Sequence, residues 1–196
     1  MSLINDGPGA TPATASKPPR FPAWTGGKVF GIGLGKTGTT SLAAAMQMIG
    51  FRVKHSPRNV DDIEKFDFVN DISVACRFRF LDFVFPDARF ILTIRDIPSW
   101  LASCETHASH RTQRGPLRRI ESRFLLFGRV DFEKDVFAAA CKRHTDDVEA
   151  HFADRPGKLL IMDVCAGDGW NLLCPFLGVL PPSGAFPHHN KGTVPS

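Results

Sequence analysis

The sequence predicts a three-layer α/β fold in which a central parallel β-sheet is flanked by helices. Short apolar runs alternate with helical patterns along the chain, and this alternation is typical of βαβ units. The clearest run, RFILTI at residues 89–94, is apolar at consecutive positions rather than at every second one. A strand of that kind is covered on both faces, as the strands of parallel sheets are.

The first half of the chain begins with an arm, residues 1–26, that is rich in Pro, Gly, Ala, Ser and Thr. The arm is expected to be disordered, because it cannot bury enough apolar surface to offset its chain entropy. One domain is expected over residues 27–192, with 193–196 as a tail. The pattern then predicts a buried strand, a helix ended by Gly50, a second strand, a short helix, a third strand and the end of a further helix, over residues 29–33, 39–49, 51–55, 61–66, 68–70 and 81–85.

The second half continues the alternation after the strand at 89–94. A helix is expected from Pro98 to about His107, because proline is tolerated in a first turn. Two more helices, a last strand and a last helix are expected over residues 116–128, 133–152, 158–164 and 170–177.

Composition narrows the class of protein. The chain has 196 residues, of which 43% are hydrophobic and 22% charged, as in ordinary globular proteins. No apolar run approaches the ~20 residues that span a bilayer, and the start has no apolar core typical of a secretory signal. The five cysteines are scattered without a CxxC pair, which predicts reduced thiols in a cytoplasmic protein and no metal site. The net charge of +4 favours an anionic ligand rather than nucleic acid.

The most informative segment is the glycine-rich turn GLGKTGTTS at residues 33–41, between the first strand and the first helix. Backbone N–H groups at such a helix start bind anions, and glycines let the backbone close on the ligand. Lysine adds a cation and threonine adds hydroxyl donors. The residues predicted to bind the anion are Gly35, Lys36, Thr37, Gly38, Thr39 and Thr40.

Three other interpretations of this turn fit less well. A Walker A loop needs GxxxxGK[ST], but Phe30 stands where its first glycine would be. The dinucleotide pattern GxGxxG is present as Gly33, Gly35 and Gly38, but no acid ends the second strand to hold a ribose. An ordinary threonine helix cap needs neither the lysine nor the glycines.

The segment KTGTTSL at residues 36–42 resembles the 5′-phosphosulfate loop of sulfotransferases, which use 3′-phosphoadenosine 5′-phosphosulfate (PAPS) as donor. A second signature of this family is an Arg at a strand end with a Ser eight residues later, and Arg95 and Ser103 have that spacing. The resemblance to a short sulfotransferase-like branch extends over residues 85–96, Trp100, and residues 169–170, 173–178 and 186–191. It covers nearly the whole ordered chain and implies a P-loop-type fold.

The resemblance also implies a chemistry. A sulfuryl group would move from PAPS to a hydroxyl or amine acceptor by in-line displacement, leaving 3′,5′-adenosine bisphosphate (PAP). Lys36 would neutralise the leaving oxygen, Arg95 and Ser103 would hold the 3′-phosphate, and Lys191 and Gly192 would close over the nucleotide. The acceptor would be a small molecule, a sugar or a lipid, and no metal is expected.

The general base and two rival functions stay open in the sequence. Asp71, after the third strand, is the first candidate for the base, although it could equally cap a helix, and His55 at the end of the second strand is the substitute. An arginine-rich stretch within residues 111–123 is either a solvated face or a lid over an anion. The rivals are a nucleotide-binding P-loop protein without transfer activity and a P-loop phosphotransferase, which would need an acid beside the loop to hold Mg²⁺.

Overall fold

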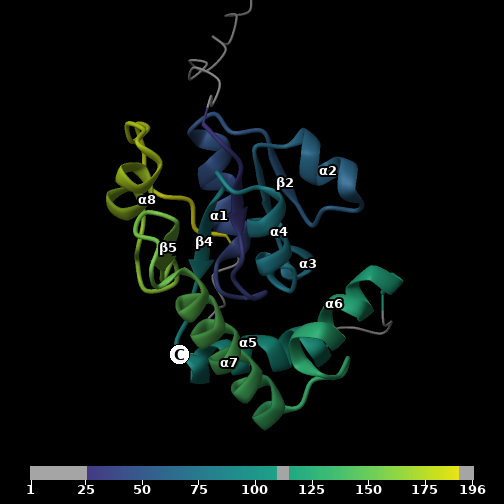
Figure 1. The fold of residues 1–196 in the computed structure, drawn as a ribbon. Helices are drawn as coiled ribbons and strands as arrows, with labels where there is room; N and C mark the ends of the chain where they lie inside the picture. Colours follow the sequence, from purple (N-terminus) through teal and green to yellow (C-terminus); the bar gives the residue numbers. More distant parts are fainter. Residues whose placement is uncertain (1–25, 110–114, 190–196) are drawn as a thin grey trace, which may run out of the picture.

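The computed structural model of the chain describes residues 26–109 and 115–189. Its centre is a five-stranded sheet in which every pair of neighbouring strands is parallel (Figure 1). The strand order is β2-β3-β1-β4-β5, which confirms the predicted α/β class. The strands are β1 Val29–Gly31, β2 Val53–His55, β3 Phe68–Asn70, β4 Arg89–Thr93 and β5 Leu159–Met162.

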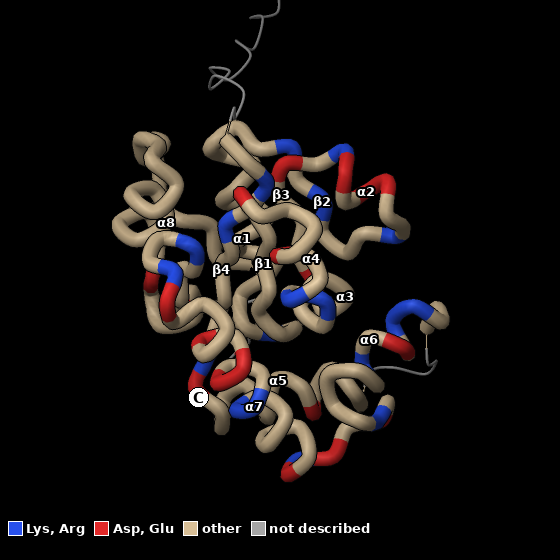
Figure 2. Tube along the Cα trace, in the orientation of Figure 1, with Lys and Arg blue, Asp and Glu red and all other residues tan. Residues whose placement is uncertain are grey.

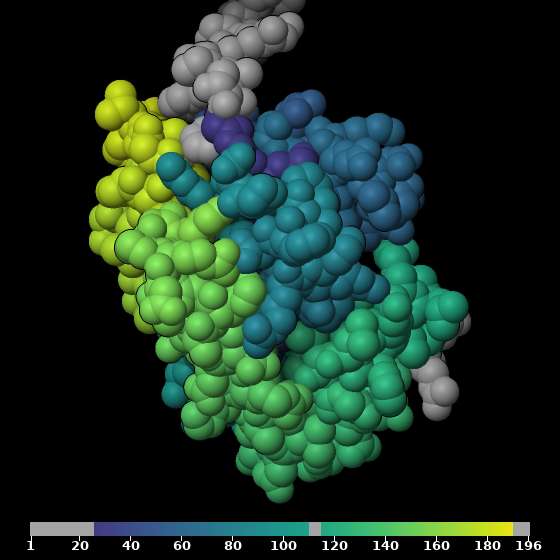
Figure 3. Space-filling model, viewed as in Figure 1, coloured from purple at the N-terminus to yellow at the C-terminus, as the bar shows by residue number. Residues whose placement is uncertain are grey.

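Two apolar clusters cover the two faces of the sheet. One is formed with α1 (Thr39–Met48) and α8 (Trp170–Leu177), and it includes Leu42, Met46 and Leu173. The other is formed with α4 (Phe78–Val84) and the second half of α7 (Lys134–Phe152). The three layers explain why the strands read as continuous apolar runs. In the space-filling view the purple β1–α1 segment is almost hidden by later parts of the chain (Figure 3).

Three helices form what we call the helical cap, beyond the carboxyl ends of the strands: α5 (Ile97–Ser109), α6 (Leu117–Phe127) and the first half of α7. They lie together at one end of the sheet in Figure 1. A third apolar cluster fills the cap and is rich in aromatic rings, with Phe127 stacked on Phe137 at 4.1 Å between ring centroids. Leu34, from the loop after β1, belongs to this cluster. The cap is therefore packed directly on that loop.

The predicted elements are all present, with ends that differ by a few residues. The sequence missed α3 (Ile72–Ala75), which has only four residues and shows no helical period. The remaining element is α2 (Val60–Lys65), begun by Asn59, whose side chain accepts from the Asp62 N–H at 3.0 Å. Residues 1–25 of the predicted arm and the tail lie outside the described residues.

Charge is spread over the described elements. Figure 2 shows Lys and Arg interspersed with Asp and Glu along most of the trace, whereas α1 and α8 carry no charged residue. Within the described ranges, no helix is both long enough and apolar enough to cross a bilayer.

Candidate active site

The glycine-rich turn forms a tight loop between β1 and α1, against the end of β4. A side chain at Gly33 would place its Cβ 1.9 Å from Thr93 Oγ1 and 2.6 Å from the Thr93 carbonyl oxygen, so only glycine fits there. Lys36 has φ 77 and Gly38 has φ 95. A positive φ is strained for a lysine and persists only where the surroundings enforce it.

Two contacts hold this loop in place. The Thr37 hydroxyl donates to the Leu34 carbonyl oxygen at 2.6 Å and shares a hydrogen bond of 2.6 Å with the Thr93 hydroxyl. From the cap, the indole N–H of Trp100 donates to the Gly35 carbonyl oxygen at 2.8 Å. The Thr37 N–H also bonds within the loop, so its predicted contact with the anion stays a prediction, and its observed role is to fasten the loop.

The start of α1 offers unused donors. Gly38 is its N-cap residue and carries no side-chain cap, and the first N–H groups of a helix have no acceptor inside it. Thr39 is buried and Thr40 is exposed in this first turn. No described carboxylate forms an ion pair with the adjacent Lys36. Orphan N–H groups beside a free ammonium fit an anion.

Arg95 lies directly beside this loop, two residues beyond the end of β4. Its Nη1 donates to the Lys36 carbonyl oxygen at 3.3 Å. Among the described residues no acid pairs with it, although Asp96 is its neighbour in sequence. Ser103 is half-buried on α5, and its hydroxyl bonds to no described residue. The structure thus brings Lys36 and Arg95 together and leaves both charges available.

The thiol of Cys104, next to Ser103, shows that cations converge here. Burial raises its pKa to about 12, and the charges of Arg123, Lys36 and Arg95 act in the opposite direction. Arg123 comes from α6, where its Nε donates to the Val130 carbonyl oxygen at 2.7 Å. Its guanidinium also lies 5.5 Å from the centre of the Phe137 ring. The charge of one arginine of the predicted lid therefore acts on Cys104, as the charges of Lys36 and Arg95 do, whereas Arg111 and Arg114 lie outside the described residues.

Asp71 caps a helix, as the alternative interpretation predicted. Its Oδ1 accepts from the Ile72 N–H at 2.7 Å at the start of α3, and the Ser56 hydroxyl donates to its Oδ2. A Cβ at Gly35 would lie 3.7 Å from Ile72 Cγ2. Because Ile72 directly follows Asp71, Asp71 lies near the glycine-rich loop. The backbone of Asp71 has φ 135, a strained conformation of the kind that gathers at functional sites. The role of Asp71 as a base stays a prediction.

His55 is tied to the loop through a residue that the sequence did not reveal. Asn70 is fully buried at the end of β3, and its Nδ2 donates to the Thr39 carbonyl oxygen at 2.8 Å. Its Oδ1 therefore accepts, and the His55 Nδ1–H donates to it at 2.9 Å. Neutral His55 then carries its lone pair on Nε2. The only signal in the sequence was a polar residue closing an apolar strand.

The carboxyl-terminal segment reaches the same helix start. The His189 N–H donates to the Ser41 hydroxyl at 2.9 Å, next to the first turn of α1. The predicted nucleotide contacts Lys191 and Gly192 lie just beyond, outside the described residues. Within the described ranges, no group of three His, Cys, Asp or Glu side chains could hold a metal ion.

This fold and site define an α/β protein with a glycine-rich loop at the carboxyl edge of a parallel sheet. The family model of the sulfotransferase domain matches residues 28–64 and 61–194. The chain therefore belongs to the sulfotransferase domain family, and it is a transferase of that class. No curated protein sequence matches the chain.

Proposed function

We propose that this sulfotransferase takes its sulfuryl group from PAPS and transfers it to a hydroxyl or amine by in-line displacement. One observation carries the choice of donor, the pairing of Lys36 with Arg95. Neither side chain has an acidic partner among the described residues. Arg95 is held beside Lys36 by its 3.3 Å hydrogen bond to the Lys36 carbonyl oxygen. A ligand with two separated anionic groups suits such a pair. The family assignment favours this function over the phosphotransferase and binding-only rivals.

The residues present fit PAPS at both of its ends. The loop and first turn, residues 35–40, offer Lys36 and the uncapped N–H groups of α1 to the 5′-phosphosulfate. Arg95 offers a planar fork of donors to the 3′-phosphate, with the free hydroxyl of Ser103 on the following helix. Lys191 and Gly192 are placed by the resemblance alone. When bound, PAPS supplies an activated sulfuryl group.

In this proposal each group of the loop and of the first turn of α1 has a defined task in the transfer. The Lys36 ammonium neutralises charge that grows on the leaving oxygen, and the bond from Arg95 to the Lys36 carbonyl holds the backbone from which this side chain extends. The uncapped N–H groups of α1 bind the oxygens that do not leave. A sulfuryl group carries one negative charge where a phosphoryl group carries two, so a lysine and backbone donors meet its demand.

The acceptor needs a base, and Asp71 is our first choice because its neighbour Ile72 contacts the loop. A carboxylate oxygen has two lone-pair sites, so the bond from Ser56 leaves Oδ2 able to accept a further proton. His55 is the second choice, through its Nε2 lone pair. The acceptor is a small molecule, a sugar or a lipid, and the cytoplasmic location indicated by the cysteines stays a prediction.

The test is a pair of calorimetric titrations with PAP and with adenosine 5′-phosphate. Losing a charge-assisted contact costs roughly 1.5–3 kcal/mol, so PAP should bind about ten- to a hundredfold more tightly. Arg95→Ala should remove most of that preference. The matched control is Arg52→Ala, which deletes an exposed arginine paired with Asp67 at the opposite end of the sheet. Equal affinity for the two nucleotides, or an equal loss in both variants, would contradict the assignment of the 3′-phosphate site.

A further inference from the structure

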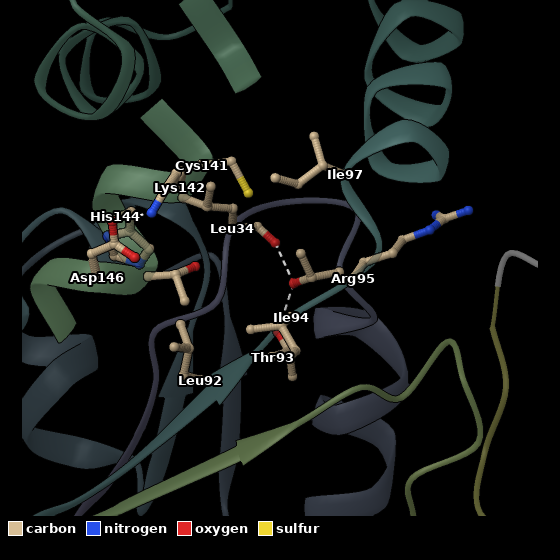
Figure 4. Close-up of a pocket in the computed structure, with 12 residues that line it drawn as sticks. Leu34, Leu92, Thr93, Ile94, Arg95, Ile97, Cys141, Lys142, His144 and Asp146 are labelled. Atoms are coloured by element: carbon tan, nitrogen blue, oxygen red, sulfur yellow. Dashed lines mark hydrogen bonds and ion pairs between the residues drawn. The ribbon is translucent and has the colours of Figure 1, made fainter. Parts of the chain in front are cut away.

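A cavity of about 200 Å³ lies behind the phosphate loop (Figure 4). Its walls are mostly apolar and come from the loop, the end of β4, the start of α5 and the middle of α7. They include Leu34, Leu92, Ile94, Ile97, Cys141 and His144. The Arg95 side chain starts at this cavity, but its guanidinium points away from it in Figure 4. The cavity is therefore a different space from the one that receives the two charges.

The loop itself separates the two spaces. Thr37 and Thr93 line the cavity, and their hydroxyls bond to each other at 2.6 Å while Thr37 also bonds to the Leu34 carbonyl. These three groups are therefore bonded to one another. A molecule in the cavity would touch the back of the loop, and it would not reach the donors at the start of α1.

Two further polar side chains line the cavity, those of His144 and Thr145, and the hydroxyl of Thr145 bonds to no described residue. His144 is 7% exposed, and its Nε2–H donates to the Ile32 carbonyl oxygen at 2.8 Å. Burial lowers the pKa of this imidazole below its ordinary value of 6.5, so the ring is neutral and its Nδ1 is an acceptor. No described residue donates to Nδ1. An unpaired acceptor in a mostly apolar wall is satisfied when a ligand brings a donor.

We propose that this cavity is a second ligand site, for a neutral, ring-sized apolar molecule that carries one O–H or N–H group. The size follows from its volume, since a cavity of about 150 Å³ holds benzene. A charged ligand is disfavoured because the walls offer it no counter-ion: Lys142 and Asp146 at the rim are paired with each other at 2.7 Å. The site is independent of sulfuryl transfer, because the ligand lies behind the loop.

The test is a ¹⁹F NMR titration of the full chain with 4-fluorophenol, in the absence of nucleotide. Saturable binding is expected, with a Kd of about 1 mM or tighter for a ligand of this size. The analogue 4-fluorotoluene, which lacks the donor, should bind about fivefold more weakly. Because no nucleotide is present, failure of this titration leaves the PAP assignment untouched, and failure of the PAP titration leaves this one untouched.

Two variants locate the probe. Cys141→Leu adds volume to the cavity wall and should weaken binding at least about tenfold, whereas Ala139→Leu adds the same side chain on the exposed side of the same helix and should leave it unchanged. If Cys141→Leu does not fold, the reactivity of the Cys141 thiol in the wild-type protein shows where the probe binds. The probe should protect Cys141 from a neutral methylthiolating reagent and leave the buried Cys174 of α8 unprotected, as peptide masses would show. Absence of saturation, unchanged binding in folded Cys141→Leu, or displacement of the probe by PAP would overturn the proposal.

Discussion

The sheet and the helical cap are packed by different means. The sheet is held by backbone ladders and by two apolar clusters, one on each face, and one of these clusters also contains neighbouring rings, with Phe90 4.8 Å from Phe152. Among its described residues the cap has no such ladder and is held by side-chain packing: Phe137 stacks on Phe127 at an interplanar angle of 6° and lies near Trp100 at 6.2 Å. The cap therefore depends on shape complementarity between a few large side chains.

This difference matters because the glycine-rich loop, residues 33–41, lies where the two regions meet. Gly33 fits only because of β4, whereas Leu34 packs in the cap cluster and Gly35 accepts the hydrogen bond from Trp100. Neighbouring residues of one loop are thus fixed by different regions. Changes in the cap are expected to reach the nucleotide, and changes deep under the sheet are expected to affect stability alone.

The largest expected effect comes from deleting a buried ring in each region. Phe137→Ala in the cap and Phe152→Ala under the sheet each remove a side chain that is at most 4% exposed, and each should cost about 3–5 kcal/mol of unfolding free energy. Only Phe137→Ala should also weaken PAP binding, by roughly two- to thirtyfold, because Trp100 loses a neighbour. Urea unfolding and PAP calorimetry on folded protein measure both quantities. Equal PAP affinity in the two variants would show that the cap does not control the loop.

A second prediction compares two glycines of the loop. Gly33→Ala places a Cβ on Thr93 and should destabilise the protein by about 3 kcal/mol, since neither the strand nor the loop can move away. Gly35→Ala meets only Ile72 at 3.7 Å, without a positive φ, and should change stability by less than about 0.5 kcal/mol. Thermal unfolding of the two variants is the measurement. Similar Tm values would mean that β4 does not fix the loop as described.

A third, smaller effect separates two tryptophans. Trp100→Phe removes the indole hydrogen bond to the Gly35 carbonyl, and Trp170→Phe removes the corresponding bond of 3.0 Å to the Gly184 carbonyl on the sheet side. Each loss should cost about 1 kcal/mol of stability. Trp100→Phe alone should raise the Kd for PAP. The increase is roughly fivefold at most, which corresponds to losing the whole free energy of that hydrogen bond from PAP binding. A loss of PAP affinity in Trp170→Phe of the same size would remove the distinction between the regions.

The smallest effect concerns the bond between His144 of α7 and the Ile32 carbonyl just beyond β1. Burial lowers the pKa of His144 from 6.5, so the unfolded chain binds more protons than the fold as the pH falls below about 6.5. Stability is therefore lost towards acid, by at most about 1.4 kcal/mol per pH unit for this one group. His144→Gln keeps an N–H donor and should flatten the decline in urea unfolding between pH 6.5 and 5. An unchanged slope would place the acid sensitivity elsewhere.

The site illustrates how far residue patterns reach. Lys36, Arg95 and Ser103 were predicted from short motifs, because each motif keeps its residues at a fixed spacing along one strand–helix unit. The contacts of Asn70 with Thr39 and His55 could not be read in this way, since they join three separate strand–helix units. The sequence also did not reveal that the Thr37 hydroxyl is bonded inside the loop, and the predicted contact of Thr37 with the anion stays a prediction.

The sequence by itself determined the class of fold, the order of its elements and the position of the glycine-rich loop. Apolar periodicity and glycine placement are local properties of the chain. They predict the elements because strands that are buried on two faces are continuous apolar runs. Only the tertiary structure decided that the cap packs on the loop through Leu34 and Trp100, and that Arg123 of α6 packs against the Phe137 ring of α7. Those contacts depend on how rings from distant helices fill one interior, and close packing of that kind leaves no periodic trace in the chain.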